Sequence, residues 1–354
     1  MNRLHVIIPA GGVGSRLWPL SRKDRPKFLL DLRMSGKSLL QETIDRLAPI
    51  AASFTIVTGR AHEQAVRAQI PQGLDVTVLV EPQGRDSMPA IGLAAYVIRQ
   101  RFGDEAPIAS FAADHAITQP QVLLDCVERA LEVAQKGYIV TIGLRPLTPS
   151  TAYGYIAPGE PFEMESPEKG SIVRSFVEKP DEETAKQYCE QGYLWNAGMF
   201  IMTAGTLARA LTRFHPDMDT HLSAIGSQWG SESFAQTLSE EWPTLTKIAI
   251  DHAIAEPLAS EGGVAVVPAT DMGWTDVGDF DALAQISSEG QALRIDSPDS
   301  FVRSLTGQKI VLVGAPNMAV IATEDAILVV DRNRAQDVKH VVDQLTQSGE
   351  EELL

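Results

Sequence analysis

Near its start the chain reads Leu4-His5-Val6-Ile7-Ile8-Pro9-Ala10-Gly11-Gly12-Val13-Gly14-Ser15-Arg16-Leu17. The apolar first part, residues 4–9, is typical of a buried strand in a parallel sheet. The glycines that follow have no Cβ, so successive backbone N–H groups can approach phosphate oxygens closely. Arg16, two residues after the last of these glycines, adds a permanent positive charge. The stretch therefore predicts an α/β sheet with a phosphate-binding turn after its first strand.

Two common glycine-rich nucleotide loops do not match this stretch. The dinucleotide-binding fingerprint needs a third glycine three residues after the second, and Leu17 stands at that position. The P-loop of kinases and GTPases needs Gly-x-x-x-x-Gly-Lys followed by Ser or Thr, and the sequence contains no such string. A glycine-rich turn by itself is often only structural, so the charged residues around it must decide between the two interpretations.

The charge of the N-terminal region is opposite to that of the whole chain. The sequence has 46 acidic and 30 basic side chains, a formal net charge of −16 and a pI near 4.9. Within residues 1–30, however, only Asp24 is acidic, whereas the basic residues are Arg3, Arg16, Arg22, Lys23, Arg25 and Lys27. A solvated charged loop is one explanation. A local basic cluster on an acidic protein favours instead a small polyanionic ligand over nucleic acid or a membrane, which select broad positive surfaces.

Length and composition are those of a globular protein. At 354 residues the chain can bury a large core and has room for about two to three domains. No apolar stretch approaches the ~20 residues that a membrane span requires. The N-terminal apolar run is too short for a signal peptide. We therefore expect a cytoplasmic protein that binds neither membranes nor nucleic acid.

The first part of the chain alternates between strand-like and helix-like segments. The strand-like runs are residues 54–57, 76–80, 108–111 and 138–142, and the helix-like stretches are 39–49, 62–69, 90–101 and 120–135. Such alternation predicts a Rossmann-like, mostly parallel mixed sheet with helices on both faces. Ligands of such sheets bind beyond the carboxyl ends of the strands. The glycine loop follows the first strand and Asp114 follows the fourth, so both are placed where a site is expected.

The end of the chain has a different pattern. Its short strand signals are residues 301–304, 309–313, 318–322 and 326–330, and a helix is expected at 335–347. We therefore predict a larger domain over residues 1–288 and a small β-rich C-terminal module over residues 289–354. Because such short strands cannot bury a core alone, the module is expected to pack on the larger domain or on a second subunit. A homo-oligomer, most simply a dimer, is the expected assembly.

Seven motifs in order give the chain a family resemblance. The motifs are Gly11 to Arg22, Pro26-Lys27, Phe111-Ala112-Ala113-Asp114-His115, Tyr153-Gly154-Tyr155-Ile156, Val177-Glu178-Lys179-Pro180, Trp195-Asn196-Ala197-Gly198-Met199-Phe200 and Trp274-Thr275-Asp276-Val277-Gly278. With these motifs the chain resembles the sugar nucleotidyltransferases, and most closely the mannose-1-phosphate guanylyltransferases, over residues 8–280. The tail is similar to that of the shorter, single-activity members. The resemblance implies that residues 1–288 form a catalytic domain with the nucleotidyltransferase fold.

The resemblance implies that GTP and α-D-mannose 1-phosphate give GDP-mannose and pyrophosphate, with Mg²⁺ required. An ionised sugar phosphate is already a nucleophile, so catalysis needs alignment and charge neutralisation rather than a Ser/His pair. The implied catalytic residues are Arg16, Lys27 and Asp114. The implied nucleotide-binding residues are Gly11, Gly12, Gly14, Ser15, Arg16, Lys27, Glu81, Arg85 and Asp86. Asp114 and Asp276 resemble the family's metal-binding carboxylates, although an isolated aspartate is more often a helix or turn cap.

The sugar phosphate is assigned by the same resemblance to a second group of residues. Lys179 and Glu178 resemble a clamp in which the ammonium binds phosphate and the carboxylate binds sugar hydroxyls. Asn196, Gly154 and Tyr155 would complete the hexose pocket. A salt bridge at the end of a surface strand is the plainer interpretation of Glu178 and Lys179.

The base-reading loop departs from the family pattern. Asp86 and Ser87 stand where the family usually has asparagine and threonine. A carboxylate from Glu81 or Asp86 could still accept from guanine N1–H and N2–H₂ together, which uracil and thymine cannot reciprocate. The departure leaves open a nucleotidyltransferase for another nucleoside triphosphate or another hexose 1-phosphate. A non-catalytic nucleotide-sugar-binding relative is a further alternative, and such a protein is expected to have lost Lys27, Asp114 or Asp276.

Overall fold

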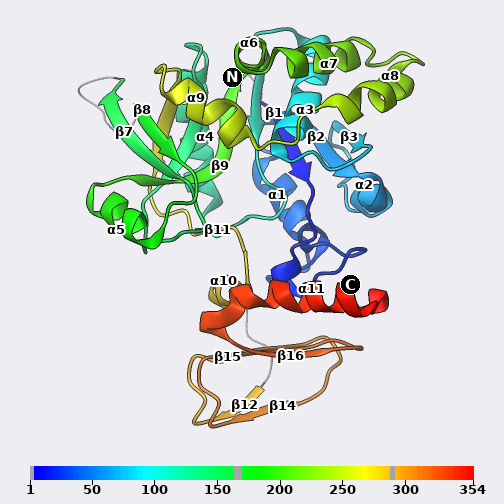
Figure 1. The fold of residues 1–354 in the computed structure, drawn as a ribbon, viewed down its shortest axis with the longest axis vertical. Helices are drawn as coiled ribbons and strands as arrows, with labels where there is room; N and C mark the ends of the chain where they lie inside the picture. The colour runs from blue at the N-terminus through cyan, green and yellow to red at the C-terminus, as the bar shows by residue number, and fades with distance from the viewer. Residues whose placement is uncertain (1–3, 163–169, 288–291) are drawn as a thin grey trace. The chain divides into compact units, whose positions relative to one another are not determined.

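The computed structural model describes residues 4–162, 170–287 and 292–354 (Figure 1). The chain forms two compact units, each assembled from separate segments. The first unit contains Met1–Gly11, Ile44–Ala112 and Ile117–Gly273, and the second contains Gly12–Thr43, Ala113–Ala116 and Trp274–Leu354. The domain boundary expected at residues 288 and 289 lies outside the described residues.

A nine-stranded mixed sheet forms the centre of the first unit. Its strands, in spatial order, are β3 (Val76–Glu81), β2 (Ala51–Gly59), β1 (Leu4–Ala10), β4 (Pro107–Ser110), β9 (Leu194–Thr203), β6 (Ile139–Leu144), β10 (Val264–Ala269), β8 (Ser171–Val177) and β7 (Tyr155–Pro161). β1 pairs in parallel with both β2 and β4, which confirms the predicted α/β fold. β9 is antiparallel to its neighbours β4 and β6 and joins the parallel strands to the rest of the sheet.

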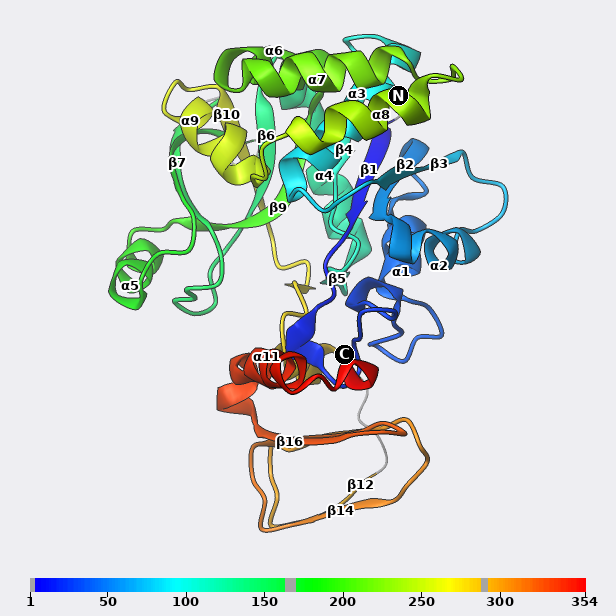
Figure 2. The ribbon, with the colours of Figure 1, turned by 45° about the vertical axis from the view of Figure 1, so that its right-hand side comes forward.

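Helices cover this sheet. They are α2 (Glu63–Ala68), α3 (Ser87–Phe102), α4 (Pro120–Ala134), α5 (Glu182–Glu190), α6 (Ala204–Phe214), α7 (Pro216–Ser227), α8 (Phe234–Glu241) and α9 (Glu256–Ala259), with a single π-helical turn at Asp251–Ala255. Residues 88–98 of α3 are all buried, because this helix is apolar on every side and packs on β1 and on α7. Figure 2 shows α6, α7 and α8 gathered beside α3. Within the described ranges, no helix combines the length and apolarity that a membrane crossing needs.

The second unit combines the early part of the chain with its end. Its strands form two small sheets, β12 (Ala292–Ile295) with β14 (Ile310–Val313), and β13 (Phe301–Ser304) with β15 (Met318–Ala322) and β16 (Ile327–Asp331). Its helices are α10 (Phe280–Ile286) and α11 (Val338–Ser348), with 3-10 turns at Ser15–Leu17, Lys27–Leu29 and Arg332–Asp337. α1 (Leu39–Leu47) and β5 (Ala116–Ile117) carry the chain from this unit back into the first, and β11 (Trp274–Thr275) begins its last segment.

Strands β13, β15 and β16 of this unit bury apolar side chains against the N-terminal segment. Phe301 and Ile321 belong to the same buried cluster as Leu17, Trp18 and Leu20. The expected C-terminal module has only a small buried cluster of its own, formed by Val302, Leu312 and Val320, within the described residues. It packs on a segment, residues 12–43, that the sequence pattern places in the larger domain.

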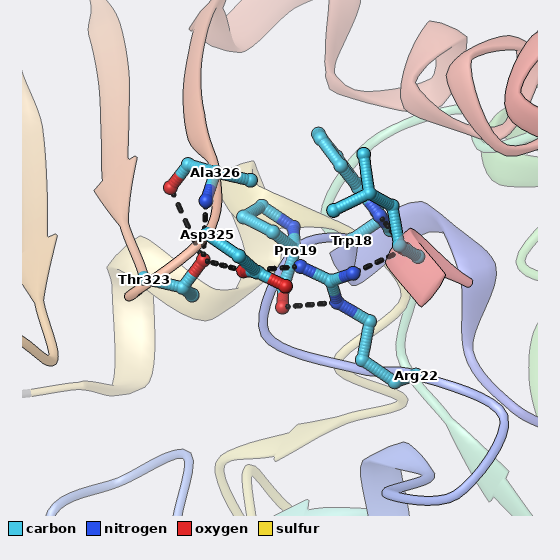
Figure 3. Close-up of polar contacts among 7 residues, drawn as sticks. Trp18, Pro19, Arg22, Thr323, Asp325 and Ala326 are labelled. Carbon is cyan, nitrogen blue, oxygen red and sulfur yellow. Dashed lines mark hydrogen bonds and ion pairs between the residues drawn. The ribbon is translucent and has the colours of Figure 1, made fainter. Parts of the chain in front are cut away.

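Polar contacts reinforce this junction (Figure 3). Arg22 is 7% exposed, and its guanidinium donates to Asp325 at 2.9 Å, to the Pro19 carbonyl at 3.1 Å and to the Leu353 carbonyl. The Trp18 indole N–H donates to the same Leu353 carbonyl at 2.7 Å. The motif that follows the glycine loop thus holds the last residues of the chain.

Candidate active site

The glycine-rich loop takes backbone conformations that glycine adopts most readily. Gly12 has φ 82° and Gly14 has φ 78°, both in the left-handed region. A Cβ built on Gly14 would lie 2.7 Å from the Cβ of Lys27, so a larger residue would displace this lysine. Gly11 and Gly12 are exposed, and Ser15 begins the 3-10 turn that follows. The loop therefore has the left-handed turns and the small residues that an exposed phosphate-binding turn requires.

Three of the residues with predicted catalytic or metal-binding roles meet in the second unit. Lys27 is 7% exposed, and its Nζ lies 2.7 Å from a carboxylate oxygen of Asp114. The same ammonium donates to the main-chain carbonyl of Asp276 at 2.6 Å. Burial raises the pKa of Asp114, but the charges of Lys27 and His115 and the hydrogen bonds to the carboxylate together hold this pKa below its usual value. Asp114 is therefore a carboxylate at neutral pH.

The turn that contains Asp276 is strained. Val277 has φ 49°, a left-handed conformation that a β-branched residue rarely adopts. Asp276 accepts from the backbone N–H of Gly278 at 3.1 Å, and Thr275 accepts from that of Val277 at 3.1 Å. A Cβ on Gly278 would lie 2.9 Å from an Asp276 carboxylate oxygen. Strain of this kind is often found at functional sites, where the surrounding structure maintains it.

These residues have the chemistry of a small magnesium site. No group of three or more His, Cys, Asp or Glu side chains in the described part of the chain is arranged to hold a metal ion. Magnesium, however, takes one or two carboxylates together with phosphate oxygens and water. The Lys27 ammonium, held by the Asp114 carboxylate and the Asp276 carbonyl, shows that this position attracts a cation. Asp114 and Asp276 thus fit a site that a bound substrate would complete.

Arg16, on the 3-10 turn after the loop, is partly exposed. One of its N–H groups donates to Gln336 Oε1 at 2.7 Å, and Gln336 in turn donates to Asp279, the N-cap of α10. The contact with Gln336 is a neutral one, so the charge of Arg16 remains available to an anion. Arg22 belongs to the same basic stretch of sequence but is committed to the contacts with the C-terminal residues. The N-terminal basic residues therefore have separate roles in the structure.

Glu81, at the end of β3 in the first unit, is a buried carboxyl group with an unsatisfied oxygen. The residue is 9% exposed, and its Oε2 makes no hydrogen bond within the described residues. Burial raises the pKa of Glu81 to about 7. A Cβ built on Gly11 or on Gly84 would lie 4.0 Å from the other oxygen, Oε1. Glu81 Oε1 therefore lies beside the backbone of Gly11 and Gly84.

The other two predicted base-loop residues make hydrogen bonds to nearby backbone in this structure. Asp86 has φ 70° and caps α3, and its carboxylate accepts from the Ser87 N–H at 2.7 Å. The Arg85 guanidinium donates to the carbonyls of Leu245 at 2.9 Å and Pro243 at 2.7 Å. In this structure Arg85 thus fixes the shape of the loop.

The predicted hexose-binding residues lie beside one another in the first unit. Gly154 precedes β7, Glu178 and Lys179 follow β8, and Asn196 lies on β9. A Cβ on Gly154 would lie 2.5 Å from Glu178 Oε2, so a side chain at this position would displace the Glu178 carboxylate. The backbone N–H of Asn196 donates to the Gly154 carbonyl at 2.8 Å. Lys179 has φ 47°, is largely exposed and pairs with Glu178 at 2.6 Å. Gly154, Glu178, Lys179 and Asn196 are thus neighbours.

Tyr155 belongs to this part of the sheet but faces its interior. Its side chain is fully buried, and its hydroxyl donates to the Ser150 carbonyl at 2.9 Å. The role expected for Tyr155 in the hexose pocket therefore depends on its backbone.

Two side chains beside Asn196 were not predicted from the sequence. Thr141 donates to Asn196 Oδ1 at 2.7 Å, and Asn196 Nδ2 donates to Asp251 at 2.8 Å. Burial, together with the nearby charge of Glu178, raises the pKa of Asp251 to about 6. Neither Thr141 nor Asp251 lies in one of the seven sequence motifs. Asp251 also begins a π-helical turn, and such a turn has no simple sequence signal.

The sequence and the structure were compared with known proteins. The chain matches the family model "Nucleotidyl transferase" over residues 5–292 and the model "MannoseP isomerase/GMP-like beta-helix domain" over residues 290–345. The mannose-1-phosphate guanylyltransferase of Escherichia coli K12 is 35% identical over 99% of this chain and 75% of its own length. The xanthan biosynthesis protein XanB of Xanthomonas campestris pv. campestris is 34% identical with the same coverage. A crystal structure described as mannose-1-phosphate geranyltransferase from Thermus thermophilus is 31% identical, with a TM-score of 0.82 over 98% of this chain and 100% of its own.

Proposed function

Since this chain belongs to the mannose-1-phosphate guanylyltransferases of the nucleotidyl transferase family, we propose that it converts GTP and α-D-mannose 1-phosphate into GDP-mannose and pyrophosphate. An oxygen of the sugar phosphate attacks the α-phosphorus of GTP in line. The new P–O bond forms as the bond from the α-phosphorus to the bridging oxygen of pyrophosphate breaks. The nucleophile is ionised at neutral pH, so no side chain has to remove a proton.

The observation that carries the proposal is the cluster of Lys27, Asp114 and Asp276. A strained turn, a buried ammonium and an ionised aspartate meet at one position. We assign Mg²⁺ to Asp114 and Asp276, where it would neutralise phosphate charge when bound. Lys27 and Arg16, with the N–H groups of Gly11, Gly12, Gly14 and Ser15, would bind the β- and γ-phosphates and stabilise pyrophosphate as it leaves.

The remaining assignments concern specificity. Glu81 would accept from guanine N1–H and N2–H₂, with Asp86 and Arg85 shaping the loop around the base. Lys179 would bind the sugar phosphate, while Glu178, Asn196 and the backbone at Gly154 and Tyr155 would bind the hexose. GTP is a cytoplasmic metabolite, so the proposed location of the protein is the cytoplasm.

The test is pyrophosphate release from the purified protein with Mg²⁺. GTP, UTP, dTTP, ATP and CTP are each paired with mannose 1-phosphate and with glucose 1-phosphate. We expect turnover largely confined to GTP with mannose 1-phosphate. Turnover with a different pair would overturn the base or sugar assignment, and no turnover with any pair would favour a non-catalytic nucleotide-sugar-binding relative.

We also propose that the protein forms a dimer through the second unit. The outer faces of β12 and β14 expose Leu293, Ile295, Val311 and Val313, each about half exposed or more. Leu293 pairs in register with Val311, and Ile295 with Val313, so the four side chains form a continuous patch. A contiguous apolar patch on an otherwise acidic protein is typical of a contact surface, and a second copy would present the same patch.

A further inference from the structure

The Asn196 side-chain amide is held on both of its polar ends. Its Oδ1 accepts from the Thr141 hydroxyl at 2.7 Å and from the Gly198 backbone N–H at 3.1 Å. Its Nδ2 donates to Asp251 Oδ1 at 2.8 Å. Asn196 is 8% exposed and Thr141 is fully buried, so these bonds are largely protected from water. The Asn196 amide therefore has one defined orientation.

This arrangement leaves one polar hydrogen of the amide available. Nδ2 carries two hydrogens, and within the described residues only the bond to Asp251 is made. A reversed amide would direct its N–H₂ group at the N–H of Gly198 and is therefore disfavoured. The same residue also lies against Gly154, whose missing side chain makes room beside Glu178.

Asp251 approaches Asn196 from a separate element. It is the first residue of the π-helical turn Asp251–Ala255, and single turns of this kind are frequent at functional sites. Its neighbour His252 is half exposed and bonds to Glu256 at 2.9 Å. The side chain of Asp251 thus contacts Asn196, one of the predicted hexose-binding residues.

We propose that Asp251 is a positioning residue of the hexose site, fixing the Asn196 amide so that its second N–H donates to a sugar hydroxyl. The inference rests on the proposed function, because it deepens the role given there to Asn196. Asp251 itself acts through the amide. Without the Asp251 acceptor, the Asn196 amide would lose one of its three hydrogen bonds and would bind the hydroxyl less well.

Steady-state kinetics of Asp251→Ala and Asp251→Asn test this role. Asp251→Ala should raise the KM for mannose 1-phosphate about tenfold, the usual effect of one lost buried hydrogen bond, with the KM for GTP unchanged. Asp251→Asn keeps an acceptor oxygen and should restore the KM to near the wild-type value. His252→Ala is the matched control from the same turn and should leave both KM values unchanged.

A second readout separates positioning from general damage to the fold. The penalty of Asp251→Ala is measured with the 2-, 3-, 4- and 6-deoxy analogues of mannose 1-phosphate. It should disappear for the analogue that lacks the hydroxyl bound by Asn196. An equal penalty for every analogue, an unchanged KM, or failure of Asp251→Asn to restore the KM would each overturn the inference.

The outcomes for Asp251 and for the proposed function are distinguishable. If the wild type uses another sugar 1-phosphate, the proposed sugar specificity is wrong, and the same variants assayed with that sugar still decide the role of Asp251. If the wild type turns over no pair of substrates, both the proposed function and the role of Asp251 are wrong. If Asp251→Ala does not fold, Thr141→Val replaces it, because it removes the bond at the opposite end of the amide and should give the same change in KM.

Discussion

Glu81 is a carboxyl group in surroundings that favour its neutral form. Burial raises its pKa to about 7, yet binding of guanine N1–H and N2–H₂ requires the carboxylate. The kcat/KM for GTP should therefore fall about tenfold between pH 8 and pH 6, since kcat/KM reports the ionisation of the free enzyme. Glu81→Gln should have a low kcat/KM for GTP that does not follow this titration. A flat wild-type profile over this range would remove Glu81 from the base site.

Glu81 should lower the free energy of unfolding at neutral and alkaline pH. Its pKa in the folded protein is above the unfolded value of 4.5, so its contribution is most favourable below pH 4.5 and is lost as pH rises through about 7. Glu81→Gln should thus be more stable than the wild type at pH 8, by up to about 3 kcal/mol, and no more stable at pH 4. Urea unfolding at the two pH values measures the difference. An equal difference at both values would show that ionisation of Glu81 is not its source.

Asp114→Ala should abolish turnover at every Mg²⁺ concentration. The variant removes one of two proposed metal carboxylates and leaves Lys27 bound to the main-chain carbonyls of Asp276 and Val277. A loss of about 10²–10³ or more in kcat is expected when such an electrostatic contact is removed. Circular dichroism should show an intact fold, and Asp24→Ala, at an exposed acidic position of the same unit, should behave like the wild type. Near-normal activity of Asp114→Ala would exclude Asp114 from the metal site.

The sequence predicts part of this site better than the rest. The glycine loop, Asp114 and the clamp residues lie in continuous motifs whose spacing is visible without a structure. The pairing of Lys27 with Asp114 and the partners of Asn196 depend on residues distant in sequence, such as Asp251 and Thr141. Burial likewise decides the pKa of Glu81, and no local pattern reports it.

At the scale of elements, the contacts of Arg22 with the C-terminal residues should stabilise the second unit. Arg22→Ala removes hydrogen bonds to Asp325, Pro19 and Leu353 from a side chain that is 7% exposed. We expect a loss of about 2–3 kcal/mol in the free energy of unfolding, because two backbone carbonyls and the half-exposed Asp325 carboxylate lose a charged donor that is itself buried. Arg25→Ala, at an exposed position nearby, is the control and should change stability by less than about 0.5 kcal/mol. Equal stabilities of the two variants would show that this junction is not stabilising.

Individual elements were predictable where periodicity is strong and local. The expected strands 76–80 and 318–322 correspond to β3 and β15, and the expected helix 120–135 corresponds to α4. The place of β9 within the sheet was not predictable, since strand order depends on long-range pairing with β4 and β6. The contacts of Arg22 were missed for a related reason. A basic residue beside a glycine loop has the same sequence signal whether it binds an anion or the end of its own chain.

For the whole molecule, removal of residues 290–354 should destabilise the protein rather than release a stable catalytic domain. The deletion would expose Leu17, Trp18 and Leu20, which are buried with side chains of the C-terminal strands. We expect aggregation or a strongly lowered Tm, measured by light scattering and thermal unfolding. A truncated protein as stable as the full chain would show that residues 1–289 are an independent folding unit.

The exposed patch on β12 and β14 should decide the oligomeric state. Val311 and Val313 are 49% and 65% exposed on one strand, and their neighbours in register are Leu293 and Ile295. Val311→Lys with Val313→Lys places like charges opposite each other in a symmetric dimer, where desolvation and repulsion oppose association. Light scattering should give twice the mass of 38.4 kDa for the wild type and the monomer mass for the double variant.

The control is Ile327→Lys with Val329→Lys, since these exposed residues of β16 lie in the other small sheet and should leave the dimer intact. A dimer that survives the first pair of substitutions and dissociates with the second would move the interface to β16.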